Sequence, residues 1–414
     1  MLKRIRVEQL QVGMHLKEFC GSWIDHPFWR TGFVIKDPKD IELILASKIS
    51  EVMIDCSKGL DVPAGAPGVS EIEDTPVATE SEPSETVPTK SPQETAPVTA
   101  SQEVERAARI CQQGKAAVIS MFEEVRMGKA VDVGGARQLV EDITDSVSRN
   151  PGAIISLARL KTADDYTYMH SVAVCAMMVA LAKRLGMDEA QTRHCGMAGL
   201  LHDVGKVAMP SEVLNKPGKL TDAEFDIMRT HPTEGYKMLM ASSGVDVVSL
   251  DVVLHHHEKV DGSGSPEKLK GDEISLYAKM GAVCDVYDAI TSNRPYKLGW
   301  DPAESLRRMA EWNGHFDPTV FQAFVKSMGI YPVGSLVRLT SGRIGVVTEQ
   351  SAKSLTMPLI KVFFSTKSNM RIVPVMVDLS QHSTLEKIIS REDPTQWNFP
   401  DLNELWSGLP HLGR

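Results

Sequence analysis

The sequence predicts a mainly α-helical protein, with a small α+β domain before the helical core and a small β-rich extension after it. Three observations lead to this prediction. Apolar residues recur at helical spacing from about residue 102 to residue 332. Strand-like alternation is confined to the first 55 residues and to the chain beyond residue 332. The chain has 414 residues, which is enough for two or three domains with cores of their own.

Composition and charge indicate a soluble globular protein and argue against broad affinity for nucleic acids. Apolar residues make up 42% of the chain and charged residues 24%, which is ordinary for such proteins. The formal net charge is −9, and seven acidic residues with one lysine in residues 66–100 supply most of it. The acidity is therefore a local property and says little about a ligand.

Cysteine usage and apolar runs favour a cytoplasmic protein. The six cysteines are scattered without a Cys-x-x-Cys pair, so we expect free thiols in a reducing compartment. The N-terminus lacks an apolar stretch suited to export. The longest apolar run, residues 172–182, is too short to cross a bilayer.

The α+β domain is predicted for residues 1–65. Apolar residues alternate over residues 12–19, and helical spacing follows over residues 41–46. Residues 51–55 then have the pattern of a buried strand. A domain of this length can form only a small core.

A tether and a helical lead-in are predicted next. Residues 66–100 contain six prolines and no aromatic residue, a composition typical of a flexible acidic linker. Helical patterns over residues 102–127 and 133–148 indicate a helical lead-in spanning residues 101–160. It either packs on the domain that follows or forms a dimerisation face, and the sequence leaves both open.

The helical core, residues 161–332, is expected to hold a metal site. Seven of the twelve histidines lie between residues 170 and 257, which chance crowding explains poorly. An apolar helical stretch over residues 195–201 leads directly into His202 and Asp203. A neutral imidazole and a hard carboxylate at a helix end can bind divalent cations from neighbouring directions.

Two further histidines are candidates because of their position along the predicted helices. His170 lies on an inward-facing apolar stripe, where a lone histidine is more often a satisfied core residue than a ligand. His231 precedes Pro232, and a residue before proline is disfavoured in a helix. We therefore expect the preceding helix to end near His231, at an element end where sites are usually assembled.

Acidic and histidine residues continue the pattern further along the core. The run His255–His257 precedes a Gly-rich turn and is hard to explain by packing. Asp285 and Asp288 lie one turn apart on the apolar helix expected over residues 277–291. A buried carboxylate needs a partner, and a metal is the obvious one for at least one of them. Asp288 could instead orient a ligand histidine or cap a turn.

The last part of the chain is predicted to be rich in strands. Residues 333–339, 344–348 and 359–364 read as strands of a small antiparallel sheet or barrel within an extension over residues 333–392. The tail, residues 393–414, has two tryptophans in a polar context. It either docks back on the protein or stays loose, and the sequence does not decide.

Together these motifs resemble the HD-GYP phosphodiesterases, a branch of the HD metal-dependent phosphohydrolases that hydrolyse the bacterial second messenger cyclic di-GMP. The resemblance covers roughly residues 160–340 and implies an all-helical core of the HD type. It rests, in order, on His170-Ser171, His202-Asp203-Val-Gly-Lys206, His231-Pro232-x-x-Gly235, His256-His257-Glu258-x-x-Asp261-Gly-Ser-Gly264, Asp285-Val-Tyr-Asp288-Ala and Arg294-Pro-Tyr-Lys297. Val12-Gly-Met14 and Trp23-x-x-x-x-Phe28 look like the small uncharacterised domain that often precedes this core.

The resemblance implies a role for each of these positions. Asp203 and Lys206 would be catalytic, Asp203 by bridging two ions and Lys206 by meeting the scissile phosphate. The metal ligands would be His170, His202, Asp203, His231, His256, His257 and Asp285. The residues that bind substrate would be Lys206, Asp288, Gly264, Ser265, Arg294 and Lys297, of which the last two would hold the remaining phosphate or guanine.

The sequence departs from the family pattern at two positions. Members with three metals carry a glutamate four residues before the first ligand histidine, and here that residue is Tyr166. We therefore expect two metal ions. The tyrosine of the Gly-Tyr-Pro signature is Ser265 here, which removes an aromatic surface without touching an implied ligand. Weaker or altered substrate binding with retained chemistry is the expectation.

Three functional hypotheses follow from the resemblance and the residues. The first is hydrolysis of cyclic di-GMP to linear pGpG, and on to GMP, by water activated between two divalent ions, with iron or manganese favoured over zinc or nickel. The second keeps the chemistry but changes the substrate to another cyclic dinucleotide, a nucleotide or an alarmone. The third is a catalytically weak or inactive cyclic di-GMP sensor or protein-interaction module, because the signature tyrosine is Ser265. The expected partners are the dinucleotides, without membrane or nucleic-acid polymer; a homodimer and a diguanylate cyclase or other signalling protein stay open.

Overall fold

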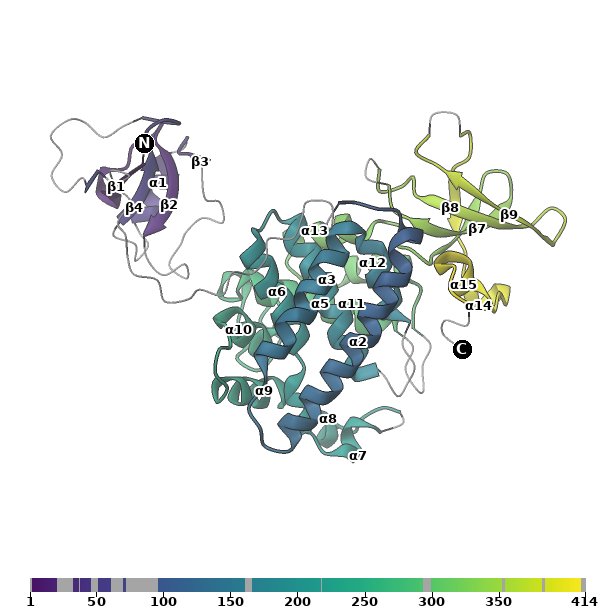
Figure 1. Ribbon diagram of the computed structural model, residues 1–414, viewed down its shortest axis with the longest axis horizontal. Helices are drawn as coiled ribbons and strands as arrows, with labels where there is room; N and C mark the ends of the chain where they lie inside the picture. Colours follow the sequence, from purple (N-terminus) through teal and green to yellow (C-terminus); the bar gives the residue numbers. More distant parts are fainter. Residues whose placement is uncertain are drawn as a thin grey trace. The chain divides into compact units, whose positions relative to one another are not determined.

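The structure, a computed structural model, divides the chain into two compact units, residues 1–88 and 89–414 (Figure 1). It describes residues 2–20, 33–36, 38–45, 51–60, 70–71, 96–160, 166–216, 218–292, 299–351, 354–381 and 384–410. Arg294 and Lys297, the side chain of Tyr166 and the segment from Trp23 to Phe28 lie outside the described residues. None of the described helices is both long enough and apolar enough to cross a membrane.

The N-terminal unit is an antiparallel sheet with one helix, as its alternating and helical patterns predicted. The strands, in the spatial order β3-β2-β4-β1-β5, are β1 (Leu2–Arg6), β2 (His15–Cys20), β3 (Phe33–Val34), β4 (Glu51–Asp55) and β5 (Ser70–Glu71), and the helix is α1 (Pro38–Leu45). Ile5, Leu16, Ile44, Val52 and Ile54 are among its buried core residues. The sequence did not predict β1, because only Ile5 is buried in Leu-Lys-Arg-Ile-Arg and no alternation is visible.

The N-terminal sheet includes two residues beyond the predicted domain boundary at residue 65. Residues 70–71 form β5, which pairs with β1 through Lys3 and Arg4. Residues 72–95 lie outside the described part of the chain. At the other end, α2 already begins at Ala100, capped by Thr99 with Gln102.

The second unit is mainly helical, which confirms the predicted fold class. Its longer helices are α2 (Ala100–Arg126), α3 (Val133–Arg149), α4 (Pro151–Arg159), α5 (Tyr166–Arg184), α6 (Glu189–Leu201), α9 (His231–Met240), α10 (Val247–His255), α11 (Leu276–Thr291), α12 (Pro302–Glu311) and α13 (Pro318–Met328). Shorter ones are α7 (Ser211–Leu214), α8 (Asp222–Met228) and the 3-10 turns η3 (Val204–Ala208) and η4 (Gly271–Glu273). Capping boxes precede two of these helices, Asp188 with Gln191 before α6 and Thr221 with Glu224 before α8. The sequence predicts both, because in each pair an acidic or hydroxyl residue is followed three positions later by Gln or Glu.

The helix α5 lies at the centre of this unit, because residues 172–182 are apolar on every side and all are buried. Helices α2, α3, α4, α6, α11 and α13 pack around it, with α2 and α3 side by side in Figure 1. The helix α6 approaches α5 closely at Gly199, where an added Cβ would lie 3.0 Å from the backbone of Cys175. This close approach brings the end of α6 to the middle of the core.

A buried ion pair joins α2 to α3. Arg149 donates from Nε to Glu103 Oε2 and from a terminal nitrogen to Oε1, both at 2.8 Å, and the Ser146 hydroxyl donates to Oε1 at 2.9 Å. The side chains of Glu103 and Arg149 are 0% and 8% exposed. The Glu103 carboxylate raises the pKa of Arg149 through these hydrogen bonds, so the guanidinium stays charged in the interior.

The C-terminal extension is an antiparallel sheet followed by two short helices. Its strands, in the order β10-β6-β7-β8-β9, are β6 (Leu336–Leu339), β7 (Arg343–Glu349), β8 (Leu359–Ser365), β9 (Met370–Asp378) and β10 (Ile388–Arg391). The sequence did not predict β9 and β10; β9 exposes both of its faces, so it shows no alternation. The tail forms α14 (Pro394–Trp397) and α15 (Leu402–Ser407) and docks back through the buried ring of Trp406.

Candidate metal centre

Side chains from five helices of the second unit converge on one point. His170 comes from α5, His202 and Asp203 follow α6, His231 begins α9, His256 and His257 follow α10, and Asp285 comes from α11. These seven residues, named the metal centre from here on, are all buried except His257, whose side chain is 36% exposed. They include every predicted metal ligand.

Asp203 lies in the middle of the metal centre, and its two carboxylate oxygens face different histidines. Oδ2 is 3.4 Å from His170 Nε2 and 3.3 Å from His202 Nε2. Oδ1 is 3.2 Å from His231 Nε2 and 3.9 Å from His256 Nε2. The carboxylate therefore separates two groups of imidazole nitrogens.

Each side of Asp203 forms a group that could hold an ion. His170, His202 and Asp285 have donor atoms within 4.8 Å of one another, and so do His231, His256 and His257. A third overlapping group contains His202, Asp203 and His256. On the first side, Asp285 Oδ1 is 3.0 Å from His170 Nε2; on the second, Asp285 Oδ2 is 3.7 Å from His257 Nδ1.

Backbone carbonyls fix which nitrogen of each ring faces the centre. His202 Nδ1 donates to Gly199 O at 2.8 Å, and His231 Nδ1 donates to Met228 O at 2.7 Å. His256 Nδ1 donates to Val253 O at 3.0 Å. A neutral imidazole carries only one N–H proton, which these bonds place on Nδ1. Nε2 is therefore unprotonated, and its lone pair points towards the centre.

The inward atoms repel one another unless a cation lies between them. His231 Nε2 and His256 Nε2 are 3.3 Å apart, and Asp203 Oδ1 is close to both. Burial, together with the neighbouring His257 and His202 rings, holds the pKa of His256 well below its usual range, so this ring is neutral. Several electron-rich donors around one point are the donor set that borderline divalent metals prefer, and the residues present therefore fit such ions.

Electrostatics keep the two acids of the centre ionised. Burial alone would raise the pKa of Asp203, but His202 and Lys206 outweigh it and hold that pKa well below the usual range. Burial alone would likewise raise the pKa of Asp285, but the hydrogen bond with His170 and the neighbouring histidine rings outweigh it and hold that pKa well below its usual range. Both carboxylates are thus available as anionic ligands at neutral pH.

Two glycines bring His231 against the segment that carries Asp203 and Lys206. A Cβ on Gly205 would lie 1.9 Å from His231 O and 2.5 Å from Gly235 N. The backbones of η3 and α9 are therefore in direct contact, which only glycine allows here. Lys206 extends from η3 and its Nζ donates to Asp203 Oδ2, with 20% of its side chain exposed.

The structure corrects the expected position of His231. The preceding helix α8 ends at Met228, and His231 is the first residue of α9, with Pro232 in the first turn. Proline is tolerated there because the N–H that it lacks has no partner within the helix. Pro232 marks a helix start rather than the end of the helix before it.

The structure also corrects the expectation that Asp288 binds substrate. Its side chain is 2% exposed and lies behind His170, whose Nδ1 donates to Asp288 Oδ2 at 2.6 Å. Ser292 Oγ donates to the other oxygen at 3.3 Å. A carboxylate in this position orients a ligand histidine, the alternative that the sequence had left open, and cannot reach a substrate.

We expect the Asp288→Ala variant to bind metal about 10- to 100-fold more weakly, because His170 would lose the partner that fixes its ring. The measurement is a competition titration of metal-free protein against a chelating dye. Asp272→Ala, which removes an exposed aspartate on η4, is the matched control and should bind metal like the parent protein. Unchanged affinity in Asp288→Ala would show that His170 is held by packing alone.

The loop after His257 is folded back on that histidine. Ser265 N donates to His257 O at 3.3 Å, and Glu258 Oε1 accepts from the backbone N–H groups of Glu267 and Lys268 at 2.7 and 2.9 Å. A Cβ on Gly264 would lie 2.4 Å from Lys259 N, so the loop packs tightly on itself. Gly264 and Ser265 therefore lie beside the metal centre. Glu258, a motif residue for which the sequence predicts no separate role, holds the two residues that follow Pro266.

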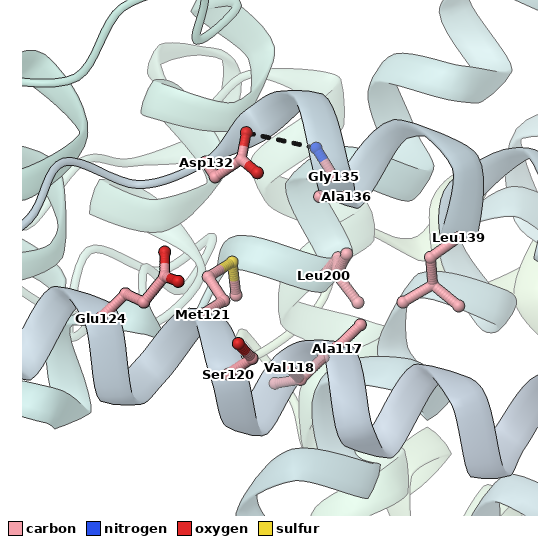
Figure 2. A pocket seen from close by; sticks show the side chains of 10 residues that line it. All are labelled: Ala117, Val118, Ser120, Met121, Glu124, Asp132, Gly135, Ala136, Leu139 and Leu200. Atoms are coloured by element: carbon pink, nitrogen blue, oxygen red, sulfur yellow. Dashed lines mark hydrogen bonds between the residues drawn. The ribbon is translucent and has the colours of Figure 1, made fainter.

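Two other candidate regions lie away from the centre. His255 points outward and pairs with Asp251 at 2.8 Å and Glu267 at 3.3 Å. A pocket of about 180 Å³ lies between α2 and α3, with Leu200 of α6 in its lining (Figure 2). Its lining carries no histidine, and its Asp132 caps α3. The pocket therefore lacks the groups that phosphoryl chemistry needs.

Comparison with known proteins gives two family matches and several relatives. Residues 144–320 match the family described as "HD domain", and residues 2–136 match the "Domain of unknown function (DUF3391)". A cyclic di-GMP phosphodiesterase of Pseudomonas aeruginosa is 53% identical over 410 residues, 99% of this chain and 96% of that protein. A cyclic di-GMP phosphodiesterase response regulator of Xanthomonas campestris is 43% identical over 149 residues, 35% of this chain and 39% of that protein.

A further relative has a different named substrate. It is a 3′3′-cGAMP-specific phosphodiesterase of Vibrio cholerae, 34% identical over 168 residues, 40% of this chain and 39% of that protein. The HD-domain match covers all seven residues of the metal centre, and an HD domain implies divalent metal binding. With a relative that matches almost from end to end, the chain belongs to the HD-GYP family of HD-domain phosphodiesterases.

Proposed function

We propose that this chain hydrolyses cyclic di-GMP to linear pGpG, and pGpG further to GMP, at a centre of two divalent metal ions. The relative that matches nearly the whole chain is a cyclic di-GMP phosphodiesterase, which supports the substrate. The observation that carries the two-ion centre is the position of Asp203, whose oxygens each face a separate group of histidine nitrogens.

Each proposed ion has its own set of residues. His170, His202 and Asp285 would hold one, His231, His256 and His257 would hold the other, and Asp203 would be shared. When bound, two such cations lower the pKa of a shared water toward ~7 and offset the charge that develops on a phosphodiester. Imidazole and carboxylate donors suit iron and manganese, which we favour, and also zinc and nickel.

Substrate can reach this centre from one side. His257 and Lys206 are partly exposed, whereas the side chains of the other six ligands are buried. A phosphodiester would therefore approach from the side of these two residues. The Lys206 ammonium donates a hydrogen bond to Asp203 in this structure. We propose that it donates to a phosphate oxygen when substrate binds, and that its positive charge stabilises the phosphate. Arg294 and Lys297, outside the described residues, are proposed to hold the rest of the dinucleotide.

The sensor hypothesis has less support than the enzyme hypothesis. Ser265 contributes a backbone hydrogen bond to His257 O, and its side chain is not among the groups that converge on Asp203. A protein that only bound the dinucleotide would not need the seven converging donors with oriented histidine rings. We therefore propose that Ser265 alters substrate affinity and leaves the hydrolytic chemistry in place.

Turnover assays with defined metals test the proposal. Chelated protein is reloaded separately with Fe²⁺, Mn²⁺, Zn²⁺ or Ni²⁺ and incubated with cyclic di-GMP, pGpG or 3′3′-cGAMP, and the products are separated by chromatography. We expect pGpG and then GMP from cyclic di-GMP, with two metal ions per chain by elemental analysis. If 3′3′-cGAMP were hydrolysed and cyclic di-GMP were not, the proposal that cyclic di-GMP is the substrate would be refuted. Tight binding of cyclic di-GMP without any product would refute the enzyme hypothesis and favour the sensor hypothesis.

Replacing Lys206 by alanine should lower kcat by about 10²- to 10³-fold, the usual cost of removing one charge-stabilising donor. The metal content should stay at the parental level, because Lys206 is not among the converging donors. Lys216→Ala, which removes a lysine paired with Glu224, serves as the control and should keep parental kcat. Loss of metal from Lys206→Ala would contradict the assignment of this lysine to the phosphate.

A further inference from the structure

A cluster of stacked aromatic rings lies in the loop between α12 and α13. We define the aromatic cluster as Trp312, His315 and Phe316. The His315 and Phe316 rings are 4.3 Å apart with planes at 25°, and the Trp312 and His315 rings are 5.6 Å apart at 27°. Phe316 is buried, whereas Trp312 and His315 are partly exposed. Two nearly parallel rings are therefore accessible on top of a buried one.

The aromatic cluster is bonded to the loop that leaves the metal centre. Val260 N donates to His315 O at 3.3 Å, and Asp261 N donates to Gly314 O at 3.0 Å. Gly314 has a left-handed backbone, with φ +76°, and a Cβ there would lie 2.9 Å from Asp261 Oδ2. The two loops are thus in backbone contact, only three and four residues beyond the ligand His257.

This contact joins the cluster to the metal centre through its most exposed ligand. His257 is the ligand with the most exposed side chain, and the segment that follows it leads directly to the cluster. His315 is also close enough to Asp285 for that carboxylate to influence its titration. Burial, with Lys259 nearby, lowers the pKa of His315 to about 4, so its ring is neutral at pH 7. A neutral imidazole stacks without attracting a counter-ion.

We propose that Trp312 and His315 form a stacking site for a purine base of the substrate, and this inference rests on the proposed function. A dinucleotide whose phosphodiester lay at the metal centre would extend its bases beyond that centre. Near-parallel rings that are partly exposed offer such a base a flat apolar face, which every purine can use without a specific hydrogen bond. The site would recognise that the ligand carries a purine, and other groups would select guanine.

Kinetics of paired variants test the stacking site. The Trp312→Leu and His315→Ala variants should raise KM for cyclic di-GMP about 5- to 150-fold, the range of one lost base stack, while kcat changes much less. Trp312→Phe keeps a ring and should recover most of the affinity. The matched control is Trp397→Leu, since Trp397 also stacks on an aromatic ring, Phe399, but in the C-terminal extension. It should leave KM unchanged.

Tryptophan fluorescence gives a second readout that does not depend on turnover. Purine dinucleotides, pGpG and 3′3′-cGAMP among them, should quench emission in the parent protein and quench it less in Trp312→Phe. Unchanged KM in Trp312→Leu, or equal quenching in both proteins, overturns the stacking site while leaving the proposed function intact. If the parent protein turns over no cyclic di-GMP, the proposed function fails and the quenching experiment still decides the stacking site. Circular dichroism establishes that each variant is folded.

Discussion

The Asp203→Ala variant is expected to lose both its metal and its turnover. Asp203 lies between the two histidine groups with one oxygen towards each, so its removal takes a ligand from each proposed ion. It also leaves the inward Nε2 atoms of His231 and His256 without the negative charge that would help to hold a cation between them. Elemental analysis of purified protein and product chromatography with cyclic di-GMP measure the two effects.

The control for this variant is Asp226→Ala, which removes an exposed aspartate on α8. It should keep parental metal content and rate. A folded Asp203→Ala protein that still hydrolysed cyclic di-GMP would rule out the shared carboxylate. Loss of metal from only one site, with one ion per chain retained, would show that Asp203 belongs to a single ion.

The second large effect is on stability. Replacing Glu103 by alanine leaves the Arg149 guanidinium buried without its carboxylate, and breaking such a pair costs about 3–5 kcal/mol of the free energy of unfolding. Thermal unfolding followed by circular dichroism measures the loss. The expected result is a markedly lower midpoint for the unit that contains residues 89–414.

Two variants make this experiment specific. Glu105→Ala removes an exposed glutamate two residues along the same helix and should change the midpoint little. The double variant Glu103→Leu/Arg149→Met replaces the pair by apolar side chains and should recover most of the stability, since no unpaired charge remains. A single variant as stable as the parent would mean that water reaches Arg149.

Local signals predicted the fold well where short-range chemistry decides it. Asp188 with Gln191 and Thr221 with Glu224 identified two helix starts, because capping depends on residues only three positions apart. The same kind of signal misled at Pro232, which can end one helix or begin the next. The strand β9 was missed because neither of its faces is buried, so no alternation exists to be read.

The metal centre depends on contacts that local patterns do not reveal. His170 and Asp285 are 115 positions apart, and in the sequence only the resemblance to a known family connects them. The resemblance did not specify which nitrogen of each imidazole points inward, since Gly199 O and Met228 O are unremarkable in sequence. The place of Asp288 behind His170 likewise requires three-dimensional packing.

The carbonyl groups that hold the histidine rings have a consequence for metal choice. Backbone oxygens hold three of the five imidazoles in place, so these rings would be aimed inward in a metal-free chain and little ordering would accompany ion uptake. A rigid nitrogen-rich cage of this kind discriminates poorly among neighbouring first-row elements, whose occupancy then follows supply. The metal bound in purified protein should therefore depend on the growth medium. Growth in manganese-rich instead of iron-rich medium should replace bound iron by manganese without changing the protein's structure.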